Sequence, residues 1–97
     1  MGAKADYTHE ITHFNGRDVL KIEDMNIGNI SVTNDIENVV TDIARMENID
    51  PCRYMIVYKD SEGLWDGWDH RVWEFIPLQC DTWQESVNKY ISLQVNS

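Results

Sequence analysis

A segment near the N-terminus has the residue types of a zinc site. Residues 9–13 read HEITH, formally the HExxH pattern. On a helix, two histidines four positions apart share one face and can bind one zinc ion, while the glutamate between them polarises a water molecule. This pattern makes His9 and His13 candidate metal ligands and Glu10 a candidate base. A small zinc-dependent hydrolase is therefore one candidate function.

The surrounding sequence favours a strand here and disfavours zinc. Asn15-Gly16 is a strong turn signal, because both residues tolerate the positive φ angles of a type I′ hairpin. On the strand that precedes this turn, His9 and His13 are separated by roughly 13 Å and Glu10 points to the other face. The five residues resemble the motif of zinc metalloproteases, but no third ligand follows at a characteristic spacing. A helix that ends at Asn15-Gly16 is the alternative that would keep the hydrolase.

A second cluster combines carboxylates with tryptophans in the segment 57–69, VYKDSEGLWDGWD. We interpret this segment as a turn-rich loop that carries a recognition surface, because loops on a rigid sheet can present side chains outward. Exposed tryptophan is enriched at interaction hot spots. The alternatives are tryptophans that fold back onto the core, and a carboxylate cluster around a cation, although the spacing departs from that of an EF-hand. The candidate binding residues are Trp65, Trp68, Asp60, Glu62, Asp66 and Asp69, with Asp35 and Asp42 from the acidic face of a neighbouring helix.

Charge and composition limit the possible partners. The 97 residues suit a single domain, 1–97, and carry 8 basic and 17 acidic residues, a net charge of −9. This field repels nucleic acid and favours a basic protein partner, although a merely solubilising surface would look the same. We expect no membrane span, no cofactor and a cytoplasmic location with Cys52 and Cys80 reduced.

Periodicity predicts the elements that position these side chains. A hairpin around 15–16 is followed by an amphipathic helix from Thr33 or Asn34 to the region before Pro51. Strands are expected at 54–58 and 70–76, the second stopped by Pro77. A capping box, T-W-Q-E at 82–85, begins the last helix. The order ββ-α-ββ-α predicts an α+β two-layer sandwich, with an antiparallel or mixed sheet of about four strands and both helices on one face.

The expected core contains the apolar stripes of both helices and the alternating side chains of the strands. Trp73, in alternation with Phe75, and Trp83, at the start of the last helix, are predicted to be buried there. Trp65 and Trp68 are predicted to lie in the loop tip, where a large ring is hard to bury completely but can equally fold back over its own sheet.

Two strings, SVTNDIENVV (31–40) and VYKDSEGLWDGWD (57–69), resemble small uncharacterised acidic proteins of phages and mobile elements. The resemblance transfers no activity, but it implies a protein that blocks host machinery by binding. We therefore expect a non-enzymatic inhibitor of a basic, nucleic-acid-binding host protein. The alternatives are the zinc hydrolase and a self-associating structural or assembly subunit.

Overall fold

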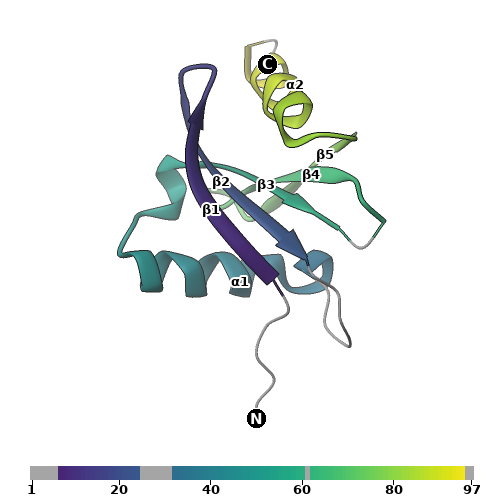
Figure 1. Ribbon diagram of the computed structural model, residues 1–97. Helices are drawn as coiled ribbons and strands as arrows, with labels where there is room; N and C mark the ends of the chain where they lie inside the picture. The colour runs from purple at the N-terminus through teal and green to yellow at the C-terminus, as the bar shows by residue number, and fades with distance from the viewer. Residues whose placement is uncertain (1–6, 25–31, 61, 96–97) are drawn as a thin grey trace.

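The computed structural model describes residues 7–24, 32–60 and 62–95. Within these residues the chain forms an α+β fold of five strands, two α-helices and one short 3-10 helix (Figure 1). The elements in chain order are β1 (Tyr7–Phe14), β2 (Arg17–Asp24), α1 (Val32–Glu47), η1 (Pro51–Arg53), β3 (Met55–Lys59), β4 (Trp65–Asp69), β5 (Glu74–Cys80) and α2 (Trp83–Val95).

The strands form one mixed sheet in the order β1-β2-β3-β4-β5. Neighbouring strands are antiparallel except β2 and β3, which are parallel. Parallel strands need a long connection, and α1 lies within the segment that joins them. The expected mixed sheet is confirmed, with five strands where about four were expected.

The first hairpin forms as predicted. β1 and β2 pair in register from Tyr7↔Asp24 to Phe14↔Arg17. Asn15 and Gly16 connect them with φ angles of 53° and 78°. Two consecutive positive φ angles are the requirement of a type I′ turn.

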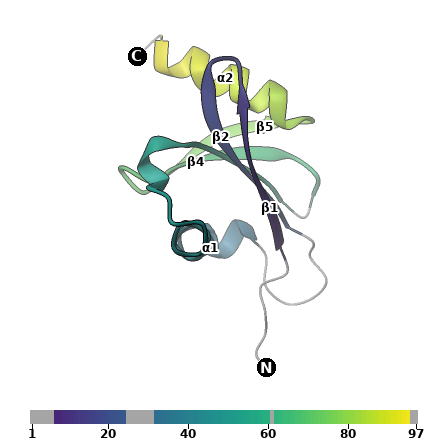
Figure 2. The ribbon, with the colours of Figure 1, turned by 60° about the vertical axis from the view of Figure 1, so that its left-hand side comes forward.

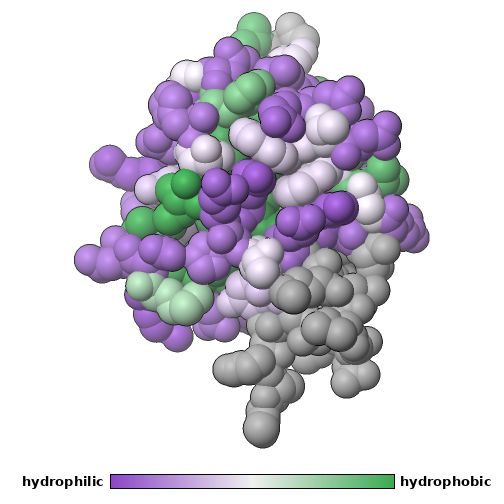
Figure 3. Space-filling model, in the orientation of Figure 1, coloured by the Kyte–Doolittle hydropathy of each residue, from purple (hydrophilic) through white to green (hydrophobic). Residues whose placement is uncertain are grey.

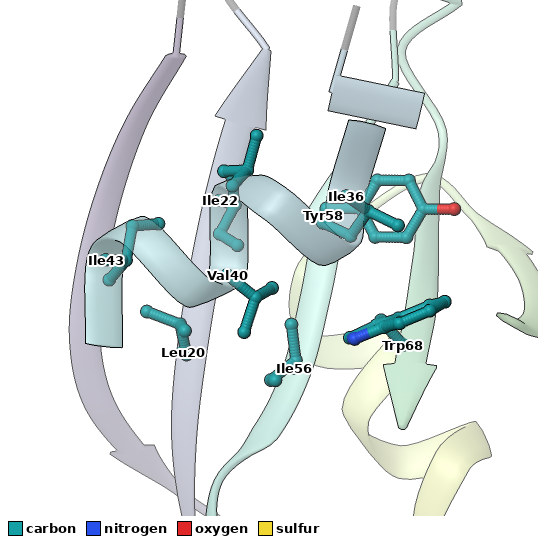
Figure 4. Close-up of a cluster of buried hydrophobic side chains, with 9 residues drawn as sticks. Leu20, Ile22, Ile36, Val40, Ile43, Ile56, Tyr58 and Trp68 are labelled. Atoms are coloured by element: carbon teal, nitrogen blue, oxygen red, sulfur yellow. The ribbon is translucent and has the colours of Figure 1, made fainter. Parts of the chain in front are cut away.

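The two helices cover opposite faces of the sheet, so the prediction that both lie on one face is wrong. Figures 1 and 2 show the sheet between α1 and α2 in both views. α1 packs on β2 and β3, whereas α2 packs on β3, β4 and β5. Two separate buried clusters result, and Figure 4 shows the one under α1. Its labelled side chains are Leu20, Ile22, Ile36, Val40, Ile43, Ile56, Tyr58 and Trp68.

The burial pattern of β3 explains why helices cover both faces of the sheet. Residues 55–58 of this strand are all buried, although successive side chains of a strand point to opposite faces. Ile56 and Tyr58 belong to the cluster under α1, and Met55 and Val57 to the cluster under α2. A strand that is apolar at every position is typical of a sheet covered on both sides.

The segment 65–69, expected to be a loop tip, is strand β4 in the interior of the sheet. Trp65 faces α2 and Trp68 faces α1, and they are only 6% and 2% exposed. Asp66 and Gly67 weaken the strand signal in the sequence, because both residue types are depleted in strands. Pairing on both sides, with β3 and β5, overrides that local preference.

The following strand begins later than predicted. Residues 70–73 form a turn, and β5 runs from Glu74 to Cys80 with Pro77 inside it. Pro77 is tolerated because β5 is an edge strand, and backbone groups on the outer side of an edge strand form no ladder hydrogen bonds.

The predicted capping box at the start of α2 is confirmed. The Glu85 backbone N–H donates to Thr82 Oγ1 at 3.2 Å, and the Thr82 N–H donates to Glu85 Oε1 at 3.3 Å.

The outer surface matches the charge of the sequence. The face drawn in Figure 3 is predominantly hydrophilic, and its apolar side chains form small separate areas. In the described part of the chain, neither helix has the length and apolar character needed to cross a bilayer.

We predict that Gly67→Ala destabilises the fold by about 1–3 kcal/mol, because a Cβ there meets tightly packed side chains. An ideal Cβ would lie 3.0 Å from both Leu78 Cδ1 and Tyr90 Cε2 and 3.1 Å from Ile76 Cβ. The measurement is the free energy of unfolding in urea. Leu78→Ala supplies a matched test: its cost and that of Gly67→Ala should sum to more than the cost of the double variant. Additive costs would contradict the crowding.

Candidate binding surface

The HEITH residues do not form a zinc site. They lie on β1, where His9 and His13 are four strand positions apart and Glu10 points to the opposite face. Each has a partner of its own: His9 Nε2 with Glu47 Oε2 at 2.7 Å, His13 Nδ1 with Asp18 Oδ1 at 3.1 Å, and Glu10 Oε1 with Lys21 Nζ at 3.1 Å. Among the described residues, no three His, Cys, Asp or Glu side chains gather in a group that could hold a metal ion. The helical geometry that the hydrolase requires is absent from this segment.

Three of the six predicted recognition carboxylates, those of Asp60, Asp66 and Asp69, accept hydrogen bonds from backbone amides. Asp60 Oδ1 accepts from the N–H groups of Glu62 at 2.9 Å and Leu64 at 3.1 Å, which closes the turn between β3 and β4. Carboxylates that bond their own backbone in this way are typical turn formers. These side chains therefore have structural roles before any role in recognition.

Asp66 holds an irregularity between β4 and β5. The register of the two strands shifts between Trp65 and Gly67, and Gln79 opposite has a φ angle of 53°. Asp66 Oδ1 accepts from the N–H groups of Leu78 at 2.9 Å and Gln79 at 3.0 Å, and Oδ2 accepts from Gln79 Nε2. The carboxylate thus satisfies backbone donors that a bulge leaves without strand partners.

Asp69 organises the turn between β4 and β5. Its Oδ1 accepts from the Arg71 N–H at 3.0 Å and Nε at 3.1 Å, and its Oδ2 accepts from Arg71 Nη2 at 2.9 Å. The guanidinium hydrogen bonds hold the pKa of Asp69 below its ordinary value, against the opposing effect of partial burial.

The remaining predicted acidic residues are dispersed. Glu62 is exposed at the β3–β4 turn. Asp42 is exposed on α1, 3.8 Å from Arg45. Asp35 belongs to the first turn of α1, and its side chain lies outside the described residues. The acidic side chains that the structure describes therefore do not form one cluster.

Three of the four tryptophans differ from the prediction, whereas Trp83 is partly buried against the cluster under α2, as predicted. Trp65 and Trp68 are buried, whereas Trp73 and Phe75, predicted to be core, are 56% and 52% exposed. Val72 beside them is 57% exposed. We call Val72, Trp73 and Phe75 the aromatic patch.

The aromatic patch forms because α1 leaves the outer strands of its face uncovered. Phe75 on β5 pairs with Trp68 on β4, so both side chains point to the α1 side of the sheet. The Phe75 ring meets the Trp68 ring edge-on, with centroids 5.1 Å apart, and Trp73 does the same at 5.9 Å. The two exposed rings thus help to cover Trp68, while more than half of their own surface remains accessible.

Backbone geometry fixes the direction of Trp73. Its φ angle is 57°, in the left-handed region that large side chains rarely adopt. Such a conformation costs on the order of 1 kcal/mol or more, and persists only where the surroundings impose it. Here the Asp69–Arg71 hydrogen bonds close the turn and the Trp68 ring receives the Trp73 side chain.

His70 contacts both Trp68 and Trp73. Trp68 Nε1 donates to His70 Nδ1 at 3.0 Å, and the His70 ring lies 5.1 Å from the Trp73 ring, tilted by 33°. Because indole nitrogen can only donate, His70 Nδ1 must be the unprotonated nitrogen. Partial burial lowers the pKa of His70, although the carboxylates of Asp50 and Asp69 act in the opposite direction.

Carboxylates lie near the side of the sheet that carries the aromatic patch. The hydroxyl end of Tyr58 points away from the apolar cluster in Figure 4. The pKa of Tyr58 is raised, first by burial and then by the carboxylates of Asp66 and Asp60. The uncovered half of this face therefore combines exposed aromatic rings with carboxylates at its margin.

Sequence reasoning missed the patch because it assigned 70–76 to a strand. One signal was present: Asp69 two residues before Arg71 and four apolar or aromatic residues between 72 and 76 fit a tight turn leading into an edge strand. The left-handed conformation of Trp73 has no signal in the sequence, because that conformation is rare for its residue type.

We predict that His70 makes stability depend on pH near neutrality. Its pKa is lower in the folded protein than in the unfolded chain, so the unfolded chain binds the proton more readily. The stabilisation is complete above the unfolded value of about 6.5 and is lost as pH falls through the folded pKa. Urea unfolding across this range should show the loss.

The matched variant is His70→Asn, which keeps an acceptor near the Nδ1 position but does not titrate. It should remove the part of the pH dependence that His70 causes and leave the rest unchanged. An NMR titration that gave His70 a pKa at or above about 6.5 would contradict the buried acceptor role.

Comparison of the sequence with protein-family models and with curated proteins, and of the fold with solved structures, found no significant match. The aromatic patch is therefore interpreted from the geometry of this chain.

Proposed function

We propose that this protein is a non-enzymatic binding protein that engages a basic protein partner through the aromatic patch. The observation that carries the proposal is the exposure of Val72, Trp73 and Phe75, each more than half accessible, at neighbouring positions of one turn and edge strand. Contiguous exposed apolar side chains rimmed by polar ones mark interaction sites more often than isolated ones do.

The construction of the patch suits a binding hot spot. Trp73 and Phe75 are held by ring contacts with Trp68, so little side-chain freedom would be lost when a partner covers them. Aromatic anchors of this kind supply much of the affinity of protein interfaces. The patch thus replaces Trp65 and Trp68 as the centre of the proposed surface.

Charge supports the choice of a basic partner. The net charge of −9 steers cationic proteins toward the molecule, and the carboxylates of Asp60 and Asp66 act on Tyr58 at the margin of the patch. An arginine of the partner can stack on the exposed face of Trp73 by a cation–π interaction. Direct binding of nucleic acid is disfavoured by the same charge.

We propose in addition that the protein inhibits its partner and that it acts in the cytoplasm. Cys52 and Cys80 are free thiols, which suits a reducing compartment. A partner that ordinarily grips nucleic acid would present the basic surface that the acidic exterior requires.

The test is capture of partners from host lysate by wild type and by Trp73→Ala/Phe75→Ala, followed by binding kinetics with the purified partner. We expect one basic protein that the double variant loses, with affinity lowered at least about tenfold, mainly through faster dissociation. Trp73→Ala alone should show most of the loss, and it leaves Phe75 over Trp68 to protect the fold.

The matched controls are Met46→Ala and Leu93→Ala, which remove apolar side chains that are 64% and 46% exposed on the two helices. They should bind like wild type. Equal binding by the patch variants and the controls would refute the proposed surface. A mass that rises with concentration for the protein alone, and falls back in Trp73→Ala, would instead assign the patch to self-association.

A further inference from the structure

Three of the four arginines of this acidic chain line one pocket. Arg17, Arg53 and Arg71 come from three separate segments and border a half-open pocket of about 180 Å³, which Tyr90 and Gln94 of α2 also line. The fourth, Arg45, lies on α1 and is not among the lining residues. Such a concentration of guanidinium groups contrasts with the net charge of −9.

Two of these arginines lie at the same end of the β2–β3 ladder. Val19 pairs with Met55 in the parallel β2–β3 ladder, and both belong to the cluster under α2. Arg17 is the first residue of β2, and Arg53 is the last residue of η1, two residues before β3 begins. Like charges repel each other, so an anion placed between the two guanidinium groups would relieve repulsion.

The carboxylates at the pocket already have cationic or histidine partners. Asp69 is hydrogen bonded to Arg71, and Asp18 Oδ1 lies 3.1 Å from His13 Nδ1. By contrast, Arg17 Nη1 donates to an amide oxygen, Gln94 Oε1, at 3.3 Å.

Arg53 has the weakest pairing of the three. Its Nε lies 4.0 Å from Asp50 Oδ2, beyond hydrogen-bond distance, and its side chain is 83% exposed. Among the described contacts, most of the N–H donors of Arg17 and Arg53 therefore have no carboxylate acceptor.

We propose that this pocket binds a phosphate group between Arg17 and Arg53. Each guanidinium presents a planar fork that matches two oxygens of an oxyanion, and phosphate has enough oxygens for both forks. The pocket volume of about 180 Å³ accommodates such a group. The inference uses no residue of the aromatic patch and stands apart from the proposed function.

The pocket is assigned to binding and not to reaction. Cys52 lines it, but the pKa of the Cys52 thiol is raised, by desolvation first and by Asp50 next, so the reactive thiolate is disfavoured. No step of covalent chemistry is therefore part of the proposal.

The test is an NMR titration of backbone amides with inorganic phosphate, at constant ionic strength balanced with sodium chloride. We expect saturable shifts at the residues around 17, 53 and 71. Arg17→Gln and Arg53→Gln should each weaken binding about tenfold or more, because each removes a charged hydrogen-bonding fork. Arg53→Lys should retain only part of the affinity, because a point charge replaces the fork.

Arg45→Gln is the matched control, since it removes the same charge from outside the pocket and should bind phosphate like wild type. Shifts that never saturate, or an equal loss in Arg45→Gln and Arg53→Gln, would overturn the proposal, because both would indicate general screening of charge. Phosphoserine tested beside inorganic phosphate identifies the source: tighter binding indicates a phosphate carried on a larger ligand, and equal binding indicates the free ion.

Discussion

The burial of β3 on both of its faces determines the architecture, because each face needs its own apolar layer. Residues 55–58 are buried without exception, and a strand directs successive side chains to opposite sides. No single helix layer can satisfy both sets. α1 therefore covers β2 and β3 on one side, and α2 covers β3, β4 and β5 on the other. The three layers, two separate apolar clusters and the position of the crossover helix all follow from this arrangement.

The aromatic patch results from the limited extent of the layer that α1 provides. Trp68 on β4 faces the α1 side but lies near the margin of the layer that this helix provides. Its ring is covered instead by Phe75 and Trp73, and its indole N–H is satisfied by His70. The outer faces of the covering rings remain in contact with water. The side chains that complete the core here therefore also form the aromatic patch. The stability of this part of the fold and the exposure of the patch thus depend on the same residues.

Local signals predicted the elements that depend on neighbouring residues alone. Asn15-Gly16 predicted its hairpin and the T-W-Q-E box the start of α2, because each works through hydrogen bonds or backbone angles within a few residues. β4 was missed because Asp66 and Gly67 look like turn residues, and only pairing with strands on both sides makes 65–69 a strand. The signal that residues 55–58 are apolar at every position was present, and it indicates a sheet covered on both faces. The candidate site was misplaced for the same reason, since the positions of Trp65, Trp68 and Trp73 depend on where that strand begins and ends.

The placement of β4 makes Trp65 and Trp68 core residues and leaves Trp73 exposed at the surface. The most direct test is fluorine NMR of the fluorotryptophan-labelled protein, with resonances assigned by single Trp→Phe variants. We expect the Trp73 resonance to shift when water is exchanged for heavy water, because Trp73 is 56% exposed, and we expect the resonances of Trp65 and Trp68 not to shift. Solvent shifts at Trp65 or Trp68, with none at Trp73, would contradict the placement of β4 and the aromatic patch together.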